Sequence, residues 1–324
     1  MSGRLPYTTE GATSGNFSGA TFVNDSLPRD FRMVFISNST ITCLQDDPIT
    51  NSHQVSKHSI GMIDDAADFI LGNWSSLVLV LPDKMTIFAF GGFFERDGES
   101  ACGRLWPRGP HNHVVKCYLE DLTVEEQAPM LHARFAPGVV QASDCIYVFG
   151  GGAEQDFART LCHSEQYSLQ INTWTAIQPL PAPKRCFNPA IYQRSIYLLG
   201  GWGTSHSYSY DIPTDQYTQL AFSLPATGMP GPTLIDNSKV LFIAKGKRYV
   251  FRREPFQLEA EIDDASITVS PRSSVAPNQC GEYVYFTAVL KTESKFERYF
   301  SRYSYRQQEY TLIASYENTH DQLR

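Results

Sequence analysis

Short apolar runs recur along the chain between polar turns. Three of these runs are nearly alike, at 85–92 (MTIFAFGG), 145–151 (CIYVFGG) and 195–201 (SIYLLGG). Each has the length and the β-branched or aromatic composition of a buried strand, and no part of the chain shows a helical period. The two glycines that end each run permit a positive φ or a close approach of neighbouring backbone. The pattern predicts an all-β protein built from a repeated unit.

Weaker copies of the same run extend the repeat over nearly the whole chain. They lie at 32–38, 240–246 and 282–288, so that the unit is about 50 residues long and occurs six times. In the better units an apolar strand precedes the glycine run, and an aromatic strand and a short fourth strand follow it. Each unit is therefore predicted to be a sheet of four antiparallel strands.

A single four-stranded sheet cannot cover its own apolar faces. Six sheets packed radially bury these faces against one another and leave few exposed edges. The sequence therefore predicts one six-bladed β-propeller domain over residues 1–324, although five or seven blades, or a pair of β-sandwiches, are alternatives. The expected blades cover residues 15–60, 74–131, 132–182, 183–225, 226–262 and 263–315.

Further residues recur in phase with the glycine runs. They are a tyrosine, an aromatic residue seven positions later, a proline and an arginine, namely Tyr167, Trp174, Pro181 and Arg185 in one unit and Tyr210 and Tyr217 in the next. This combination resembles the kelch repeat over residues of about 85–220. The resemblance implies a propeller with a protein-binding role, and many kelch proteins are similar to substrate receptors of ubiquitin ligases. No BTB-like or F-box-like region is expected before the repeats, so such a role would need a separate adaptor subunit.

Composition narrows the class of protein. The chain has 27 Lys and Arg against 34 Asp and Glu, and this acidic balance argues against broad nucleic-acid binding. A hydrophobic share of 42% excludes wholesale disorder. The longest aliphatic run, 77–81, is far shorter than the roughly 20 residues of a membrane-spanning helix. Seven dispersed cysteines and the lack of a visible signal peptide predict reduced thiols and a cytoplasmic or nuclear location, with the four N-terminal sequons left bare.

Three arginines lie at one phase of the repeat, a few residues before the first strand of a unit. They are Arg134, Arg185 and Arg272, and in a propeller they would lie on loops around one mouth of the central channel. In kelch proteins that bind acidic peptides, arginines at this phase bind the ligand carboxylates. Planar guanidinium groups suit this task because they pair bidentately with carboxylates. The alternative is a structural role, in which these arginines bond loop carbonyls or a neighbouring carboxylate.

Large aromatic residues are expected at the same mouth. Phe93 and Trp106 belong to a long insertion after the second glycine run, and Trp202 directly follows Gly201 at the corresponding place two units later. Aromatic residues together with arginine are typical anchors of protein interfaces. The alternative is that the insertion folds back on its own blade and Trp106 covers a blade edge.

No catalytic motif is visible in the sequence. His111 and His113, with Cys102 or Cys117 nearby, have the residue types of a zinc site but match no closed ligand set, so no metal or cofactor is expected. The sequence therefore predicts a non-enzymatic protein-binding module whose partner offers an acidic segment. A structural subunit of a larger assembly and a propeller enzyme acting on sugars are the alternatives.

Overall fold

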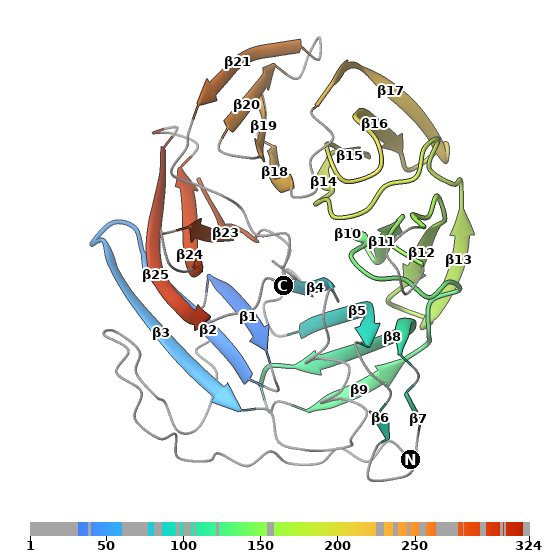
Figure 1. Ribbon diagram of the computed structural model, residues 1–324, viewed down its shortest axis with the longest axis horizontal. Coiled ribbons are helices and arrows are strands. Elements are labelled where there is room, and N and C mark those ends of the chain that lie inside the picture. Colours follow the sequence, from blue (N-terminus) through green and yellow to red (C-terminus); the bar gives the residue numbers. More distant parts are fainter. Residues whose placement is uncertain are drawn as a thin grey trace.

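A computed structural model of the chain describes the residues on which the fold rests (Figure 1). The described ranges are 32–37, 40–59, 77–80, 86–94, 98–99, 105–106, 108–120, 123–153, 159–224, 230–235, 239–244, 247–252, 257–263, 278–280, 282–291, 296–304, 307 and 309–319. Every regular element in these ranges is a β-strand, and none of them holds a helix long and apolar enough to cross a membrane. The prediction of an all-β protein is confirmed.

These residues form one three-stranded sheet, five four-stranded sheets and one short hairpin, all antiparallel. Sheet 1 consists of β1 (Met33–Ser37), β2 (Thr40–Asp47) and β3 (Ser52–Ser59). Sheet 2 consists of β4 (Leu77–Val80), β5 (Thr86–Phe94), β8 (Gly109–Tyr118) and β9 (Val124–Gln127), and the hairpin of β6 (Gly98–Glu99) and β7 (Leu105–Trp106) lies between β5 and β8 in the chain. Sheet 3 consists of β10 (Gly138–Ala142), β11 (Cys145–Phe149), β12 (Ser164–Ser168) and β13 (Thr173–Ile177).

The remaining sheets repeat this order. Sheet 4 consists of β14 (Ala190–Tyr192), β15 (Ser195–Leu198), β16 (His206–Asp211) and β17 (Gln216–Ser223). Sheet 5 consists of β18 (Pro230–Ile235), β19 (Lys239–Ala244), β20 (Lys247–Arg252) and β21 (Gln257–Asp263). Sheet 6 consists of β22 (Asn278–Cys280), β23 (Tyr283–Lys291), β24 (Phe296–Ser304) and β25 (Glu309–Thr319). The glycine runs predict the second strand in sheets 2 to 6. Sheet 1 differs, because its run is β1, the first of its three described strands.

The sheets follow one another in chain order around a common centre (Figure 1). Strand β10 contacts β4 on one side and β14 on the other, and β14 contacts β18. The outer strands β3, β9, β13, β17, β21 and β25 form the rim, where β25 of the last sheet contacts β3 of the first. The ring is thus closed by sheets from opposite ends of the chain.

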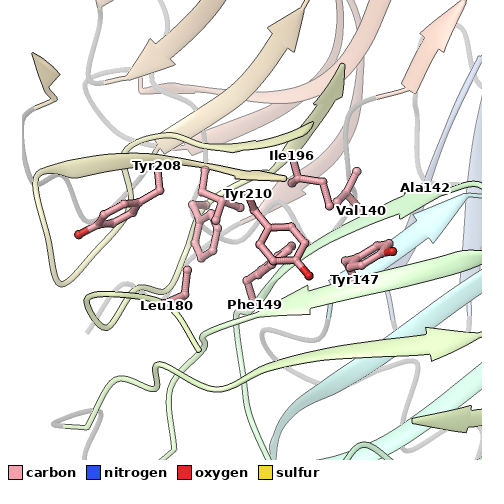
Figure 2. Close-up of a cluster of buried hydrophobic side chains, with 10 residues drawn as sticks. Val140, Ala142, Tyr147, Phe149, Leu180, Ile196, Tyr208 and Tyr210 are labelled. Atoms are coloured by element: carbon pink, nitrogen blue, oxygen red, sulfur yellow. The ribbon is translucent and has the colours of Figure 1, made fainter. Parts of the chain in front are cut away.

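Apolar side chains fill the spaces between successive sheets. Figure 2 shows one such space, in which Tyr147 and Phe149 of β11 face Tyr210 of β16. The rings of Phe149 and Tyr210 meet edge to face with centroids 5.7 Å apart. Such burial is the main favourable term in folding, at about 25 cal/mol per Å² of apolar surface. Packing between sheets therefore explains why the unit repeats.

The aromatic pair spaced by seven residues fastens sheets 3 and 4 to the sheet before them. Tyr167 on β12 lies directly opposite Trp174 on β13 in the sheet register. The Trp174 Nε1–H donates to the carbonyl of Ala128, at the end of sheet 2, over 2.8 Å. In sheet 4 the Tyr217 hydroxyl donates to the carbonyl of Gln178 over 3.1 Å. The second aromatic residue of the motif thus bonds to backbone of the preceding sheet.

The turns between third and fourth strands make a second link of the same kind. Asn172 and Asp215 both have positive φ, 51° and 53°, which short polar side chains tolerate. The Asn172 Oδ1 accepts a bond from the Ala128 amide, and the Asp215 Oδ1 accepts one from the Gln178 amide, each over 2.9 Å. Asn51, with a φ of 54°, occupies the same kind of turn in sheet 1. The neighbouring sheet is therefore held through both the N–H and the C=O of one residue.

The glycine pairs mark where the loop of the next unit crosses the sheet. Gly150 has a φ of 59°, and a Cβ there would lie 2.0 Å from the carbonyl oxygen of Lys184. A Cβ at Gly91 would lie 2.3 Å from the carbonyl oxygen of Arg134. Only a residue without a side chain fits such a crossing. The same contacts show that Arg134 and Lys184 are equivalent positions of the repeat.

Candidate functional site

The predicted site residues Arg134, Arg185 and Trp202 belong to loops at one end of sheets 3 and 4, and Phe93 lies near the end of β5. Because neighbouring strands are antiparallel, the start of β10 lies beside the end of β11, with Gly138 opposite Phe149. The loops before each first strand and after each second strand therefore meet at this end. We call it the glycine end, since the glycine pairs lie there.

Arg134 lies at the glycine end but inside the protein. Its side chain is fully buried, and its Nη1 donates to the carbonyls of Gly150 over 2.7 Å and His163 over 2.9 Å. Its Nη2 donates to the Glu165 carboxylate, which is itself buried. Burial lowers the pKa of Arg134, and the Glu165 charge opposes this shift. These contacts are those of the structural alternative, so Arg134 is left out of the surface proposed below.

Lys184 takes the corresponding place in the next unit. Its ammonium group is buried and donates to the carbonyls of Leu198, Gly200 and His206, over 3.2, 2.6 and 2.9 Å. No carboxylate is among these acceptors, and burial lowers the pKa of Lys184 to about 7. Sequence reasoning aligned Arg185 with Arg134, but the equivalent of Arg134 is the preceding residue. The side chain of Arg185 therefore has different surroundings from those of Arg134 and Lys184.

Arg185 lies between two aromatic rings. Its Cζ is 5.3 Å from the ring centroid of Trp202 and 5.5 Å from that of Phe135, distances at which a guanidinium group is attracted to a π face. The backbones of Arg185 and Trp202 exchange two hydrogen bonds, of 3.0 and 2.8 Å. Phe135 in turn meets Phe93 edge to face at 5.6 Å. We call these four residues the aromatic row.

The aromatic row runs from the interior to the surface across three sheets. Phe93 and Phe135 are buried, Arg185 is 7% exposed, and the Trp202 side chain is 50% exposed. The row therefore presents one indole ring to solvent and supports it with a cation and two further rings. Aromatic residues and arginine dominate the binding energy of protein interfaces, and Trp202 has both the residue type and the exposure of such an anchor.

The structure brings three of the six predicted site residues together. These are Phe93, Arg185 and Trp202, and Phe135, which the sequence analysis did not select, joins them. Phe135 directly follows Arg134 just as Arg185 follows Lys184, so the phase of the repeat could have indicated it. Trp106 lies on β7 opposite Gly98, and its side chain is outside the described residues. Arg272 also lies outside them. That these six residues bind a partner stays a prediction.

Another apolar side chain is exposed on the glycine end. Leu131 is 51% exposed, and its amide donates to the Glu165 carboxylate over 2.7 Å, which fixes the loop that carries it. The next residue, His132, bonds to the same carboxylate through Nδ1 over 3.0 Å and stacks on His163 with centroids 3.8 Å apart. Buried contacts to Glu165 therefore hold the part of this surface that Leu131 and His132 form.

The histidines considered as zinc ligands have other surroundings. His111 is buried and stacks on Phe94 at 4.3 Å, and burial lowers the pKa of His111 to about 3. His113 bonds to Glu126 over 3.0 Å. Within the described part of the chain, no three His, Cys, Asp or Glu residues are arranged to hold a metal ion. Free thiols are found at Cys43, Cys117, Cys145, Cys162 and Cys186.

Comparison with known proteins supports the repeat. Residues 133–181 match the family described as Kelch motif, which confirms the resemblance for this stretch. The chain is similar to human Kelch-like protein 34, with 26% identity over 44% of this chain and 22% of that protein. It is also similar to zebrafish (Danio rerio) Kelch repeat and BTB domain-containing protein 8, with 22% identity over 79% of this chain and 42% of that protein. The mouse Influenza virus NS1A-binding protein homolog is 22% identical over 59% of this chain and 28% of its own length. The chain thus covers less than half the length of these relatives.

Proposed function

Since residues 133–181 form a Kelch motif, we propose that the chain is a six-bladed β-propeller that binds another protein at its glycine end. Each of sheets 1 to 6 would be one blade. The order of the sheets around the centre and the contact between β25 and β3 support this count. The proposal assigns no chemical reaction to the chain. One relative is named for binding a viral protein, NS1A, which fits a protein-binding role.

The observation that carries the proposal is the position of Trp202. An indole ring that is half exposed and held by Arg185 is already in place before a partner arrives. Binding then costs little side-chain entropy, because neither the ring nor the guanidinium has to be ordered on docking. A surface of this kind is suited to a partner that covers the ring with an apolar side chain.

The charge of the row suggests the chemistry of the partner. Arg185 places a positive charge beneath the exposed ring, and Arg159 is exposed on the neighbouring loop of sheet 3. A partner segment with a carboxylate beside its apolar residue gains from this charge, whereas a basic segment is repelled. Attraction of this kind weakens as salt is added, because the Debye length falls from about 10 Å at 0.1 M to about 3 Å at 1 M.

Affinity purification from native extract tests the proposal. The wild-type chain is compared with Trp202→Ala and with Arg185→Gln, and retained proteins are quantified at low and high salt. Ile171→Ala is the matched control, because Ile171 is an apolar side chain, 69% exposed, on a turn at the opposite end of sheet 3. We expect the same partner to be lost from both row variants and kept by the control. Retention of every partner by Trp202→Ala would contradict the proposal.

A further inference from the structure

The residue after each glycine pair differs among the three sheets of the aromatic row. Phe93 follows Gly91 and Gly92 in sheet 2, and Trp202 follows the pair in sheet 4, but in sheet 3 this position is Gly152. The middle sheet therefore lacks a ring of its own at this place. Phe135 from the preceding loop supplies one.

Phe135 occupies the space that a side chain at position 152 would fill. A Cβ on Gly152 would lie 2.1 Å from the Cζ of Phe135 and 2.2 Å from its Cε1. The two residues also exchange backbone hydrogen bonds, of 3.0 and 2.8 Å. The φ of Gly152 is not positive, so the backbone itself would accept another residue there. The three atoms nearest to such a Cβ all belong to the ring of Phe135, so this ring is the first obstacle to a side chain at position 152.

The position of Phe135 bears directly on the exposed end of the row. The Cζ of Arg185 lies 5.5 Å from the centroid of the Phe135 ring and 5.3 Å from that of the Trp202 ring. If Phe135 moves, the guanidinium loses one of its two neighbouring rings. The contact between Arg185 and the Trp202 indole then changes as well, although neither Phe135 nor Gly152 is exposed.

We infer that Phe135, seated on Gly152, is a positioning residue that sets the place of Arg185 and Trp202 in the partner-binding surface. The inference rests on the proposed function for its biological meaning, but the positioning itself is measurable without a partner. Gly152→Ala and Phe135→Leu should both alter the surroundings of Trp202, the first by displacing the Phe135 ring and the second by replacing that ring with a smaller aliphatic side chain.

The test uses the full chain labelled with 5-fluorotryptophan and observed by ¹⁹F NMR. The chain has four tryptophans, and the Trp202 signal is assigned by its loss in Trp202→Phe. We expect this signal to shift in Gly152→Ala and in Phe135→Leu. Phe88→Leu is the control, because Phe88 is equally buried between sheets 2 and 3 and lies outside the row. It should lower stability and leave the Trp202 signal in place.

A double variant tests separately whether the ring of Phe135 is what excludes a side chain at position 152. In a Phe135→Ala background the added methyl of Gly152→Ala has room, so the second substitution should cost far less stability than it costs in the wild type. An unchanged Trp202 signal in Phe135→Leu would overturn the inference and leave the proposed function standing. If the signal shifts but Trp202→Ala still retains every partner in the affinity experiment, the positioning is supported and the proposed function is overturned.

Discussion

Arg302 on β24 donates through Nη1 to both carboxylate oxygens of Asp46 on β2, over 2.9 and 2.7 Å, across a sequence separation of 256 residues. The Tyr285 hydroxyl donates to the same carboxylate over 2.8 Å, and Arg302 Nη2 donates to Asn51 over 2.8 Å. These side chains join sheets 6 and 1, the one seam that the chain itself does not connect. Closure of the ring therefore depends on recognition between the first and last sheets.

Removing one partner of this pair should open the ring. In Arg302→Met the Asp46 carboxylate stays buried without its counter-charge, and such a loss costs about 3–5 kcal/mol of unfolding free energy. Urea unfolding measures the cost, and hydrogen exchange should show protection lost first in β1–β3 and β22–β25. Glu259→Gln, which breaks an exposed pair with Lys239, should cost less than about 1 kcal/mol. Equal loss of protection in sheet 3 would contradict a role in closure.

The buried Lys184 predicts an unusual dependence of stability on pH. Burial lowers the pKa of Lys184 to about 7 from the 10.5 of an exposed lysine, so above pH 7 the unfolded chain binds more protons than the folded one. Stability should therefore rise with pH between 7 and 10.5, relative to a variant without this group. We expect the unfolding free energy of the wild type to rise, relative to that of Lys184→Met, by about 1 kcal/mol per pH unit in this window. Urea midpoints of both proteins at pH 7, 8 and 9 give the difference, and parallel curves would refute the prediction.

Hydrogen bonds from the aromatic motif should contribute separately to stability. Tyr217→Phe keeps the ring and removes the hydroxyl's bonds to the Gln178 carbonyl and to the Ser164 hydroxyl, which should cost about 1 kcal/mol or somewhat more. Trp174→Phe removes the bond to the Ala128 carbonyl and part of the ring as well, so its cost should be larger. Thermal unfolding of the two variants and of Ile171→Ala measures these effects. A cost for Ile171→Ala as large as that of Tyr217→Phe would mean that the bond itself contributes little.

The close approach of backbone at the glycine pair predicts that a substitution there strongly destabilises the protein. Gly150→Ala places a Cβ 2.0 Å from the Lys184 carbonyl oxygen at a φ of 59°, so both space and backbone oppose it. The cost should reach at least about 3 kcal/mol, and expression of folded protein should fall. Circular dichroism and the yield of monomer after gel filtration report the outcome. Native stability in Gly150→Ala would show that the loop carrying Lys184 can move away.

Local chemistry made part of this structure predictable. Gly150 and Gly200 end strands of the expected kind, and the spacing from Tyr167 to Trp174 reports a cross-strand pair, because both features lie within one unit. Lys184 and Arg185 are adjacent cations, however, and the contacts of the Lys184 carbonyl with Gly150 and Gly151 show which of them takes the place of Arg134. The role of Phe135 could not be predicted either, because it depends on a contact in space between its ring and Gly152, which has no side chain. Asp46 and Arg302 share no repeat position, so no periodicity could pair them.

The two kinds of seam place different demands on mutation. The bonds that hold Ala128 and Gln178 use only their peptide groups, so any residue except proline whose side chain points away can replace either one and keep these bonds. The bond between sheets 6 and 1 joins two charged side chains, and a new residue at Asp46 is tolerated only if Arg302 changes with it. We therefore expect homologous chains to vary independently at positions 128 and 178 and to vary together at positions 46 and 302.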